Sequence, residues 1–337
     1  MLVTQQAVLR RFYYTTVPEQ ALDTGPVPFT LLGEPIVIWR QADGSPAAVQ
    51  DRCCHRTAKL SKGWIDGDNI VCGYHGWTYN GNGRCVHLPQ APEQTELRDI
   101  RVPAYHCKLR NGYVWVALED PLMDLPPIPE DDMDGVRCIP QFYERWHTSS
   151  LRFLENAFDN AHFSYVHRAT FGDNANPEPS RYELIEHDWG FESSTEVPIL
   201  NPPESHRLTG TNEPRTTRLL NNTYYLPFAR RFGCRYPNGL IHTIFNCATP
   251  IDDEHIQLSQ WLYRNDSEAD ASAEELIAFD RRVTNEDKEI LESTDPDACV
   301  DVSRRVEKHM VSDKPGLLIR RMLLDLLHAH GEEEVHR

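Results

Sequence analysis

The sequence lacks the features of a membrane or secreted protein. It contains no apolar run of the roughly 18–20 residues that a membrane-spanning helix requires. Its amino-terminal segment has no continuous apolar stretch and no small-residue cleavage site, so it does not have the pattern of a signal peptide. We therefore expect a cytoplasmic protein without a membrane partner.

Positive charge is scarce. The 337 residues include 34 Lys and Arg against 51 Asp and Glu, which gives a net charge of −17. The chain has no cluster of basic residues that would mark a surface for nucleic acid or for an anionic membrane. Neither partner is expected, although an acidic surface would favour a basic redox partner.

Several cofactor signatures are missing as well. The sequence has no Gly-x-Gly-x-x-Gly segment after a predicted strand and no Cys-x4-Cys-x2-Cys run, so it shows no evident NAD, flavin or plant-type ferredoxin module. Nine Cys, an odd number, are scattered through a long chain without a secretory signal. A disulfide framework is therefore not expected, and metal ligands or buried thiols explain the Cys better.

The pattern of apolar and turn residues predicts an α+β protein in two parts. The first part is rich in strands, including a hairpin with its turn at Asp43-Gly44 and a strand over 111–118. A stretch rich in Pro and acidic residues follows it. We place an all-β domain at 1–120, a linker at 121–135 and a second domain at 136–337.

The second domain should combine helices with an antiparallel sheet. The expected order is a helix over 151–167, strands over 220–264, a helix over 272–293 and a last helix over about 315–330. Ser272 and Glu275 form a capping box at the start of the clearest helix. The final residues, 331–337, are expected to be loosely held.

Two Cys and two His stand on paired loops of the first domain. Cys53 and His55, then Cys72 and His75, give the pattern Cys-x-His-x16-Cys-x2-His. A structural zinc site is the alternative, but zinc fingers usually pair like ligands, whereas each loop here supplies one Cys and one His. A [2Fe–2S] cluster with two His on one iron fits better and has a higher reduction potential than an all-Cys cluster.

A second group of possible ligands follows the linker. Asn156, Asp159, His162 and His167 give the pattern Asn-x2-Asp-x2-His-x4-His. On a regular helix the two His lie about 140° apart, so both reach one metal only if the helix ends or distorts between them. Two His and one carboxylate bind one face of Fe(II) and leave positions open for O2 and substrate. The spacing alone is weak evidence for a metal site, and the Cys/His motif upstream strengthens it.

A later carboxylate must complete such a site. The helix predicted over 272–293 has one apolar stripe, made by Leu276, Phe279, Val283 and Ile290. Asp287 falls at the centre of this stripe and Asp280 near its edge. A carboxylate on a buried face is costly unless it is paired or bound to metal, so Asp287 is the predicted third ligand and Asp280 its rival. The plain alternative for either is a partly exposed, salt-bridged Asp.

These motifs together resemble the Rieske non-haem iron oxygenases that act on aromatic rings. The likeness includes Arg56 after the first His and Gly76-Trp77 after the second. It implies that the two Cys bind one iron of a [2Fe–2S] cluster and the two His bind the other. The Rieske proteins of respiratory complexes carry an extra disulfide, but this sequence has Ala58 and Tyr74 at those positions.

The resemblance extends to the second group. It implies that His162 and His167 bind a mononuclear Fe(II), and the segment 285–288 resembles the family's third-ligand segment. It places Asp159 at a subunit interface, where it would link His75 of one subunit to His162 of the next in a head-to-tail homotrimer. A helix-surface acid is the alternative for Asp159.

The resemblance also implies a function. Asn156 is expected near the iron without being a firm ligand. The chain is most similar to the phthalate, dicamba and caffeine-demethylase group, whose members are terminal oxygenases fed by a separate NAD(P)H-dependent reductase, with or without a ferredoxin. We expect O2-dependent hydroxylation or demethylation of an aromatic or heteroaromatic compound. Tyr225, Phe245 and Trp261 are candidate pocket residues, and the alternative for them is the plain core of the sheet, where strand aromatics more often lie.

Two alternatives stay open. One is ring cis-dihydroxylation by the same kind of site. The other belongs to a different class: a Rieske-type electron-transfer protein, which would need no second iron. The ligands predicted after residue 136, and the length of the chain beyond the Rieske motif, argue against this electron carrier.

Overall fold

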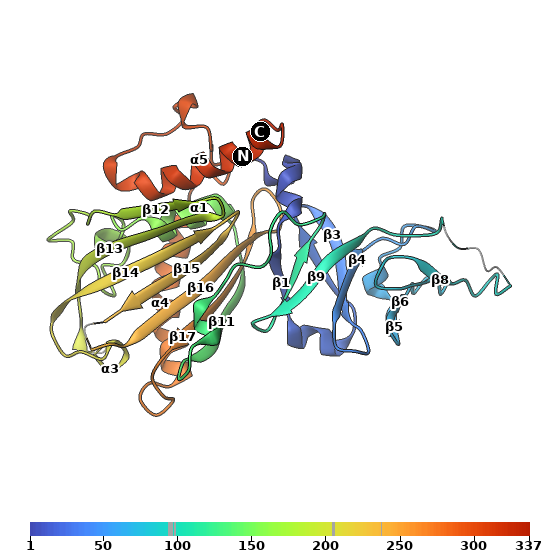
Figure 1. Ribbon diagram of the computed structural model, residues 1–337, viewed down its shortest axis with the longest axis horizontal. Helices are drawn as coiled ribbons and strands as arrows, with labels where there is room; N and C mark the ends of the chain where they lie inside the picture. Colours follow the sequence, from blue (N-terminus) through green and yellow to red (C-terminus); the bar gives the residue numbers. More distant parts are fainter. Residues whose placement is uncertain (94–96, 98, 204–205, 237) are drawn as a thin grey trace. The chain divides into compact units, whose positions relative to one another are not determined.

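The computed structural model describes residues 1–337 except 94–96, 98, 204–205, 237 and the side chain of residue 208 (Figure 1). The chain divides into two compact units. The amino-terminal unit contains Val3–Leu125 with Thr249–Asp253, and the carboxy-terminal unit contains Met1–Leu2, Pro126–Ala248 and Glu254–Arg337. In the part of the chain described, every helix is too short or too polar to cross a membrane.

The amino-terminal unit is built from two antiparallel sheets. The larger has the order β1 (Tyr14–Pro18), β10 (Tyr113–Ala117), β9 (Ala104–Arg110), β4 (Pro46–Gln50), β3 (Glu34–Arg40) and β2 (Val27–Leu31). The smaller has the order β5 (Trp64–Asp66), β6 (Asn69–Val71), β7 (Thr78–Tyr79) and β8 (Cys85–His87). Short 3-10 helices cover Val3–Gln5, Ala7–Arg11, Glu19–Thr24 and Leu60–Lys62. The predicted hairpin is β3–β4, in whose turn Gly44 has a φ of +87°.

The carboxy-terminal unit has one seven-stranded antiparallel sheet. Its order is β11 (Arg137–Trp146), β17 (Ile256–Arg264), β16 (Ile241–Pro250), β15 (Ala229–Arg235), β14 (Arg215–Tyr225), β13 (Gly190–Leu200) and β12 (Glu183–His187). The helices are α1 (Ser150–Phe158), α2 (Phe163–Val166), α3 (His206–Thr209), α4 (Ala273–Leu291) and α5 (Lys314–Ala329). Further 3-10 turns cover Pro129–Asp132, Val302–Arg304 and Val311–Asp313.

Helix α4 packs across the sheet of this unit (Figure 1). The predicted capping box at Ser272 and Glu275 is present. Leu276 is fully buried against Ile139 and Leu262, so the apolar stripe starts as predicted. It does not reach Ile290, whose side chain is 47% exposed. Helix α4 therefore buries its first half and leaves its end nearer to solvent.

The predicted helix over 151–167 is wrong as a single element. Helix α1 ends at Phe158, because Asp159 has the extended backbone angles φ −89° and ψ 141°. The chain then forms α2, a single turn that begins after His162 and ends before His167. Ser149 caps α1 by accepting a hydrogen bond from the backbone N–H of Arg152. The break supplies the change of direction that two His at this spacing need.

The expectation for residues 331–337 was also wrong. The carboxylate of Glu334 is 4% exposed and accepts the backbone N–H groups of Val300 (2.6 Å) and Asp301 (3.0 Å). His336 lies 2.9 Å from Asp297 through its Nδ1 atom. The segment has no apolar periodicity, but polar contacts hold it against the loop before α5.

Candidate metal centres and the adjoining pocket

Two loops of the amino-terminal unit hold the four predicted cluster ligands, and their backbones match. The N–H of Thr57 donates to the C=O of Cys53, and the N–H of Gly76 donates to the C=O of Cys72, each over 2.9 Å. Thr57 and Gly76 both have positive φ, +58° and +73°. A side chain at Gly76 would begin 2.9 Å from Cγ of Pro89. Each loop therefore turns back tightly just after its ligands.

The ligand side chains of the two loops converge. The His55 and His75 rings lie 4.5 Å apart between centroids. Nδ1 of His55 is buried and has no hydrogen-bond partner. Desolvation, with His75 nearby, lowers the pKa of His55, so this imidazole is held neutral. A neutral ring with an unused buried nitrogen, beside two buried thiols, fits the ligand set of a Rieske cluster.

The Cys end and the His end of this site differ in exposure. Cys53 and Cys72 are each 1% exposed and belong to the core of the unit, whereas His55 and His75 are partly exposed. Sγ of Cys53 lies 3.1 Å from the hydroxyl of Tyr79. Electrons from an outside donor would therefore meet the His end first.

In the carboxy-terminal unit, His162, His167 and Asp287 come together. Nε2 of His162 and Nε2 of His167 are 3.2 Å apart, and Oδ1 of Asp287 lies 3.4 Å and 3.3 Å from them. Ligand atoms on one face of a metal with bonds of about 2.1 Å lie about 3 Å apart. The three donor atoms therefore fit a single metal ion.

Neighbouring side chains fix the direction of each donor. Nδ1 of His162 lies 3.3 Å from Asp159, and Nδ1 of His167 lies 2.9 Å from Glu286. Nδ2 of Asn156 donates to Oδ1 of Asp287 over 2.9 Å. Carboxylates that hold the far nitrogen of a His turn the other nitrogen toward a metal. Residues of two segments, α1 with its cap and α4, thus orient the triad.

The charges at this triad call for a cation. Burial alone would lower the pKa of His162, but hydrogen bonds to Asp159 and Asp287 outweigh it and raise the pKa to about 9. Burial favours the neutral form of Asp287, yet the two imidazoles hold its pKa below the ordinary value. Burial lowers the pKa of His167. These shifts indicate that the space between the two imidazoles and the carboxylate favours positive charge.

Asp280, the rival third ligand, lies elsewhere on α4. It is 4% exposed and accepts a hydrogen bond of 2.6 Å from Nε2 of Gln141. Its other oxygen lies 3.4 Å from Nε2 of His242. It does not join either His of the triad within the described residues. The geometry supports Asp287 as the third ligand.

A pocket opens beside the triad. Its lining includes all three triad residues, the inner face of α4, and alternate residues of β13 to β17, so one face of the sheet forms a wall. Aromatic side chains on this lining are Trp146, Phe153, Phe163, Phe171, Phe232, Tyr236 and Phe279. A flat ring fits such walls, and the metal ligands lie at the edge of the space it would occupy.

Two Arg side chains line the same pocket, and in the described part of the chain neither is hydrogen-bonded to a carboxylate, although the charge of Asp287 acts on Arg230. Arg218 is 9% exposed, its Nε has no hydrogen-bond partner, and its guanidinium lies 5.0–5.3 Å from the rings of Phe171 and Tyr236. Arg230 donates 2.9 Å to Oδ1 of Asn222, and burial lowers its pKa. Buried cations of this kind are stable only when an anion pairs with them.

The predicted pocket aromatics are on the other face of the sheet. Tyr225, Phe245 and Trp261 are all buried, and their rings stack on one another with centroids 6.1 Å and 4.8 Å apart. None of them lines the pocket. They alternate with the pocket-facing residues of their strands, so this prediction was wrong.

The prediction also missed functional residues. Glu286 was read only as part of a family-like segment, yet it holds His167. Arg218 and Arg230 carried no sequence signal beyond being charged residues inside strands. A charge at an alternate position of a predicted buried strand is the signal that would have found them.

Comparison with known proteins gives matches along both units. Residues 12–106 match the family model of the Rieske [2Fe–2S] domain, and residues 146–329 match that of the vanillate O-demethylase oxygenase C-terminal domain. The chain is 28% identical to the methylxanthine N1-demethylase NdmA of Pseudomonas putida, over 97% of this chain and 92% of that protein.

Solved structures show the same likeness. The structure of Pseudomonas putida NdmA with caffeine has a TM-score of 0.85 and 27% identity, covering 97% of this chain and 94% of that one. Dicamba monooxygenase bound to dicamba has a TM-score of 0.80 at 20% identity, covering 96% and 98%, which is a likeness of fold. The predicted α+β architecture is confirmed.

Proposed function

Because this chain belongs to the Rieske oxygenases, with a Rieske [2Fe–2S] domain and a vanillate O-demethylase-type oxygenase domain, we propose that it removes a methyl group from an aromatic or heteroaromatic acid. As a member of this family it is an oxidoreductase that uses O2. The observation that carries the proposal is the triad of His162, His167 and Asp287 on the wall of an aromatic pocket.

The residues divide between two metal groups. Cys53, His55, Cys72 and His75 would hold the [2Fe–2S] cluster, and the triad would hold a mononuclear Fe(II). When bound, the two groups supply electron delivery and O2 activation. In the overall reaction one oxygen atom enters the C–H bond of an O- or N-methyl group and the other leaves as water, with two electrons and two protons supplied from outside. The hydroxymethyl product then loses formaldehyde.

Side chains around the triad fix the orientation of its three ligands. Asn156 keeps the Asp287 carboxylate facing the two His by donating to its Oδ1 atom. Asp159 and Glu286 hold the Nδ1 side of each ring, so that the Nε2 lone pairs point inward. The aromatic wall excludes water from the space beside them.

The two arginines of the pocket support an acid as substrate. A carboxylate on the ring would pair with Arg218, whose Nε is buried and unused, and Arg230 would add a second positive charge. The alternative outcome, ring cis-dihydroxylation, would need the ring carbons rather than a methyl group beside the triad. The demethylase relatives favour the methyl group.

The proposed function also implies an electron donor and an oligomeric state. We propose that electrons come from a separate NAD(P)H-dependent reductase, with or without a ferredoxin, and that the chain forms a homotrimer. The carboxylate of Asp159 is 28% exposed while it also holds His162, so it can meet a His75 from a second copy. This arrangement would connect the two kinds of site across subunits.

The test is a turnover assay with iron-loaded enzyme and a surrogate reductase. Methoxy- and N-methyl-substituted aromatic acids are offered beside their neutral amides. We expect O2 uptake and formaldehyde in equal amounts with at least one acid, and much less with its amide. O2 uptake with a cis-diol and no formaldehyde would establish dihydroxylation instead. No uptake with any compound, in enzyme with a full metal content, would contradict the proposal.

A further inference from the structure

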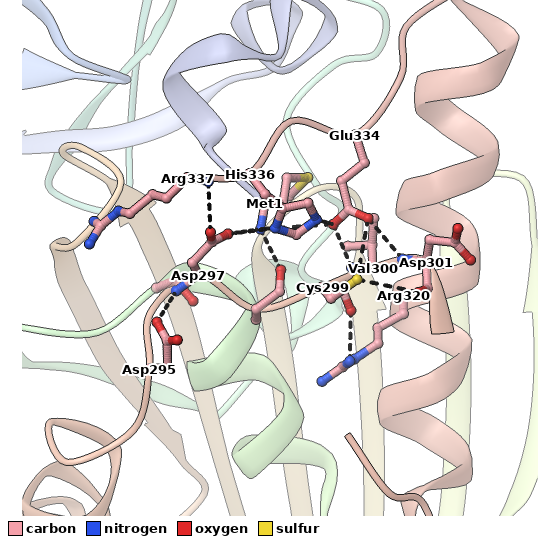
Figure 2. Close-up of polar contacts among 12 residues, drawn as sticks. Met1, Asp295, Asp297, Cys299, Val300, Asp301, Arg320, Glu334, His336 and Arg337 are labelled. Atoms are coloured by element: carbon pink, nitrogen blue, oxygen red, sulfur yellow. Dashed lines mark hydrogen bonds and ion pairs between the residues drawn. The ribbon is translucent and has the colours of Figure 1, made fainter. Parts of the chain in front are cut away.

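A third group of possible metal ligands lies outside both sites. Cys299, Glu334 and His336 offer donor atoms that all lie within 4.8 Å of one another. Cys299 lies in the loop between α4 and α5, and the other two residues follow α5 in the terminal segment 331–337. Figure 2 shows this segment beside the loop, with the His336 ring between Asp297 and Glu334.

The His336 ring carries the first observation. Its Nδ1 lies 2.9 Å from Oδ1 of Asp297 and 3.3 Å from the amino-terminal nitrogen of Met1, which also donates to Asp297, so Nδ1 can donate to the carboxylate or accept from the ammonium. Its Nε2 lies 3.1 Å from Oε1 of Glu334, yet this buried nitrogen makes no hydrogen bond there. With the ring proton on Nδ1, a lone pair on Nε2 faces a carboxylate oxygen. Such a contact is repulsive unless a cation lies between the two atoms.

The spacing of the donor atoms is the second observation. In a tetrahedral zinc site, bonds of about 2.0–2.1 Å to N and O and about 2.3 Å to S place N and O about 3.3 Å apart and S and O about 3.5 Å apart. The corresponding distances here are 3.1 Å from His336 to Glu334 and 3.6 Å from Cys299 to Glu334. The imidazole meets Oε1 of Glu334 and the thiol meets Oε2, each at a separation close to that in a zinc site, and all three donor atoms lie within 4.8 Å of one another.

The carboxylate is also fixed before any metal binds. Each oxygen of Glu334 accepts one backbone N–H, from Val300 and from Asp301. A carboxylate offers about four lone-pair positions, so Oε1 keeps one free, and the second position of Oε2 faces the Cys299 thiol that would bind the metal as thiolate. Asp297 holds the far nitrogen of His336, as an outer carboxylate does for a zinc-bound His.

We propose that Cys299, Glu334 and His336 form a zinc site that fastens the terminal segment to the loop before α5. A thiolate, an imidazole and a carboxylate suit zinc, and water would complete the four ligands. Nη1 of Arg320 on α5 donates 2.6 Å to the carbonyl of Cys299 and the same side chain pairs with Glu155 on α1. Zinc here would therefore strengthen the packing of α5 on α1 without entering the oxygenase reaction.

The experiment is metal analysis of the full chain with its iron and sulfide intact, after dialysis against Zn²⁺ and removal of loose metal. We expect about one tightly held zinc per chain in addition to the iron. Cys299→Ser and His336→Gln should each lose this zinc and keep iron and sulfide. His330→Gln, an exposed His at the end of α5, is the matched control and should keep it.

A second measurement separates this site from the triad, which could also take zinc. Asp287→Ala should keep the extra zinc, and Zn²⁺ should raise its melting temperature by several degrees. The same addition should leave the melting temperature of Cys299→Ser unchanged. Co²⁺ should give thiolate-to-cobalt absorption that disappears in Cys299→Ser. Failure to retain zinc, or equal zinc in Cys299→Ser, His336→Gln and the unaltered chain, would overturn the proposal and leave an imidazolium–carboxylate ion pair.

Discussion

The cluster loops and the iron pocket gather metal ligands in opposite ways. The loops take four donors from two short segments with matching backbones, and leave the His side partly exposed. The pocket takes two donors that flank the short helix α2 and one from the distant helix α4, and His167 is only 2% exposed. A group that receives electrons from another protein needs an accessible edge, whereas chemistry on O2 needs shelter from water.

Their surroundings differ in charge as well. Beside the loops, desolvation lowers the pKa of His55, and the charges of His75 and Arg56 act in the same direction. At the pocket, three carboxylates surround two His. Neutral rings suit a cluster whose potential must be high, and a surplus of negative charge suits a divalent ion. The comparison implies that each site can be lost without the other.

The largest effect is expected from Asp287→Ala. This change removes a predicted ligand of the mononuclear iron, so iron should fall by about one per chain and turnover at least about a hundredfold, since even outer-shell changes cost 10–100-fold. Sulfide content and the cluster's EPR signal should not change. Asp280→Asn is the control for the rival ligand and should keep the iron. Loss of iron in Asp280→Asn alone would reverse the assignment.

Within the pocket, Arg218→Gln should weaken the binding of an aromatic acid much more than the binding of its neutral amide. Removal of a charge-assisted hydrogen bond should raise the Kd of a methoxybenzoate about 10–100-fold, because such bonds contribute about 1.5–3 kcal/mol. The Kd of the neutral amide should hardly move, as titration calorimetry will measure. Arg235→Gln, on the exposed part of β15, should behave like the unaltered chain. An equal loss of affinity for the acid and the amide would contradict the proposal that the substrate is an acid.

Substitution of Gly76 tests whether the tight turn of the second cluster loop is needed to hold the cluster. Gly76→Ala places a side chain on a backbone with φ +73° and 2.9 Å from Pro89. We expect a loss of about 2 kcal/mol in unfolding free energy and a less stable cluster, with the mononuclear iron retained. Gly44→Ala has a similar φ of +87° and open space, so it should cost about 1 kcal/mol and spare the cluster. Equal effects of the two changes would mean that Pro89 does not matter.

The smallest effect is expected from Glu307, which pairs with Arg152 on α1 and Arg320 on α5. Burial would raise the pKa of Glu307, but Arg152 and Arg320 lower it to about 2. The folded pKa is below the unfolded value, so the carboxylate stabilises the fold above about pH 4.5 and this contribution disappears as the pH falls toward 2. Glu307→Gln should therefore cost about 1–2 kcal/mol at neutral pH and progressively less in acid.

Unfolding in denaturant at several pH values measures this prediction. Glu289→Gln, an exposed acid on α4, provides the control and should change stability little at any pH. A deficit of Glu307→Gln that stays constant from pH 7 to pH 3 would mean that the charge of Glu307 is not what stabilises the fold.

The features that could be predicted from the sequence are those formed by residues close together in the chain. The cluster motif lies within two neighbouring loops, and the capping box of α4 lies within four residues, so spacing alone revealed both. The faces of the sheet could not be predicted, because every residue of β17 is buried and alternation gives no sign of which face meets the pocket. That is why Trp261 and its stacked neighbours were placed on the wrong side.

Contacts between distant segments were likewise hidden. The contacts that hold His162 and His167 in place after the break at Asp159 include Asp287 and Glu286, more than 100 residues away. The choice between Asp280 and Asp287 depends on where α4 meets α2. The terminal segment is held by polar contacts, which leave no periodic pattern.

The most direct test of two separate sites is the metal content of anaerobically purified protein, with an EPR spectrum after reduction by dithionite. The account predicts about three irons and two sulfides per chain and a Rieske-type signal. Two irons and two sulfides that persist after full iron reconstitution would contradict it, because the chain would then carry a cluster and no oxygenase site.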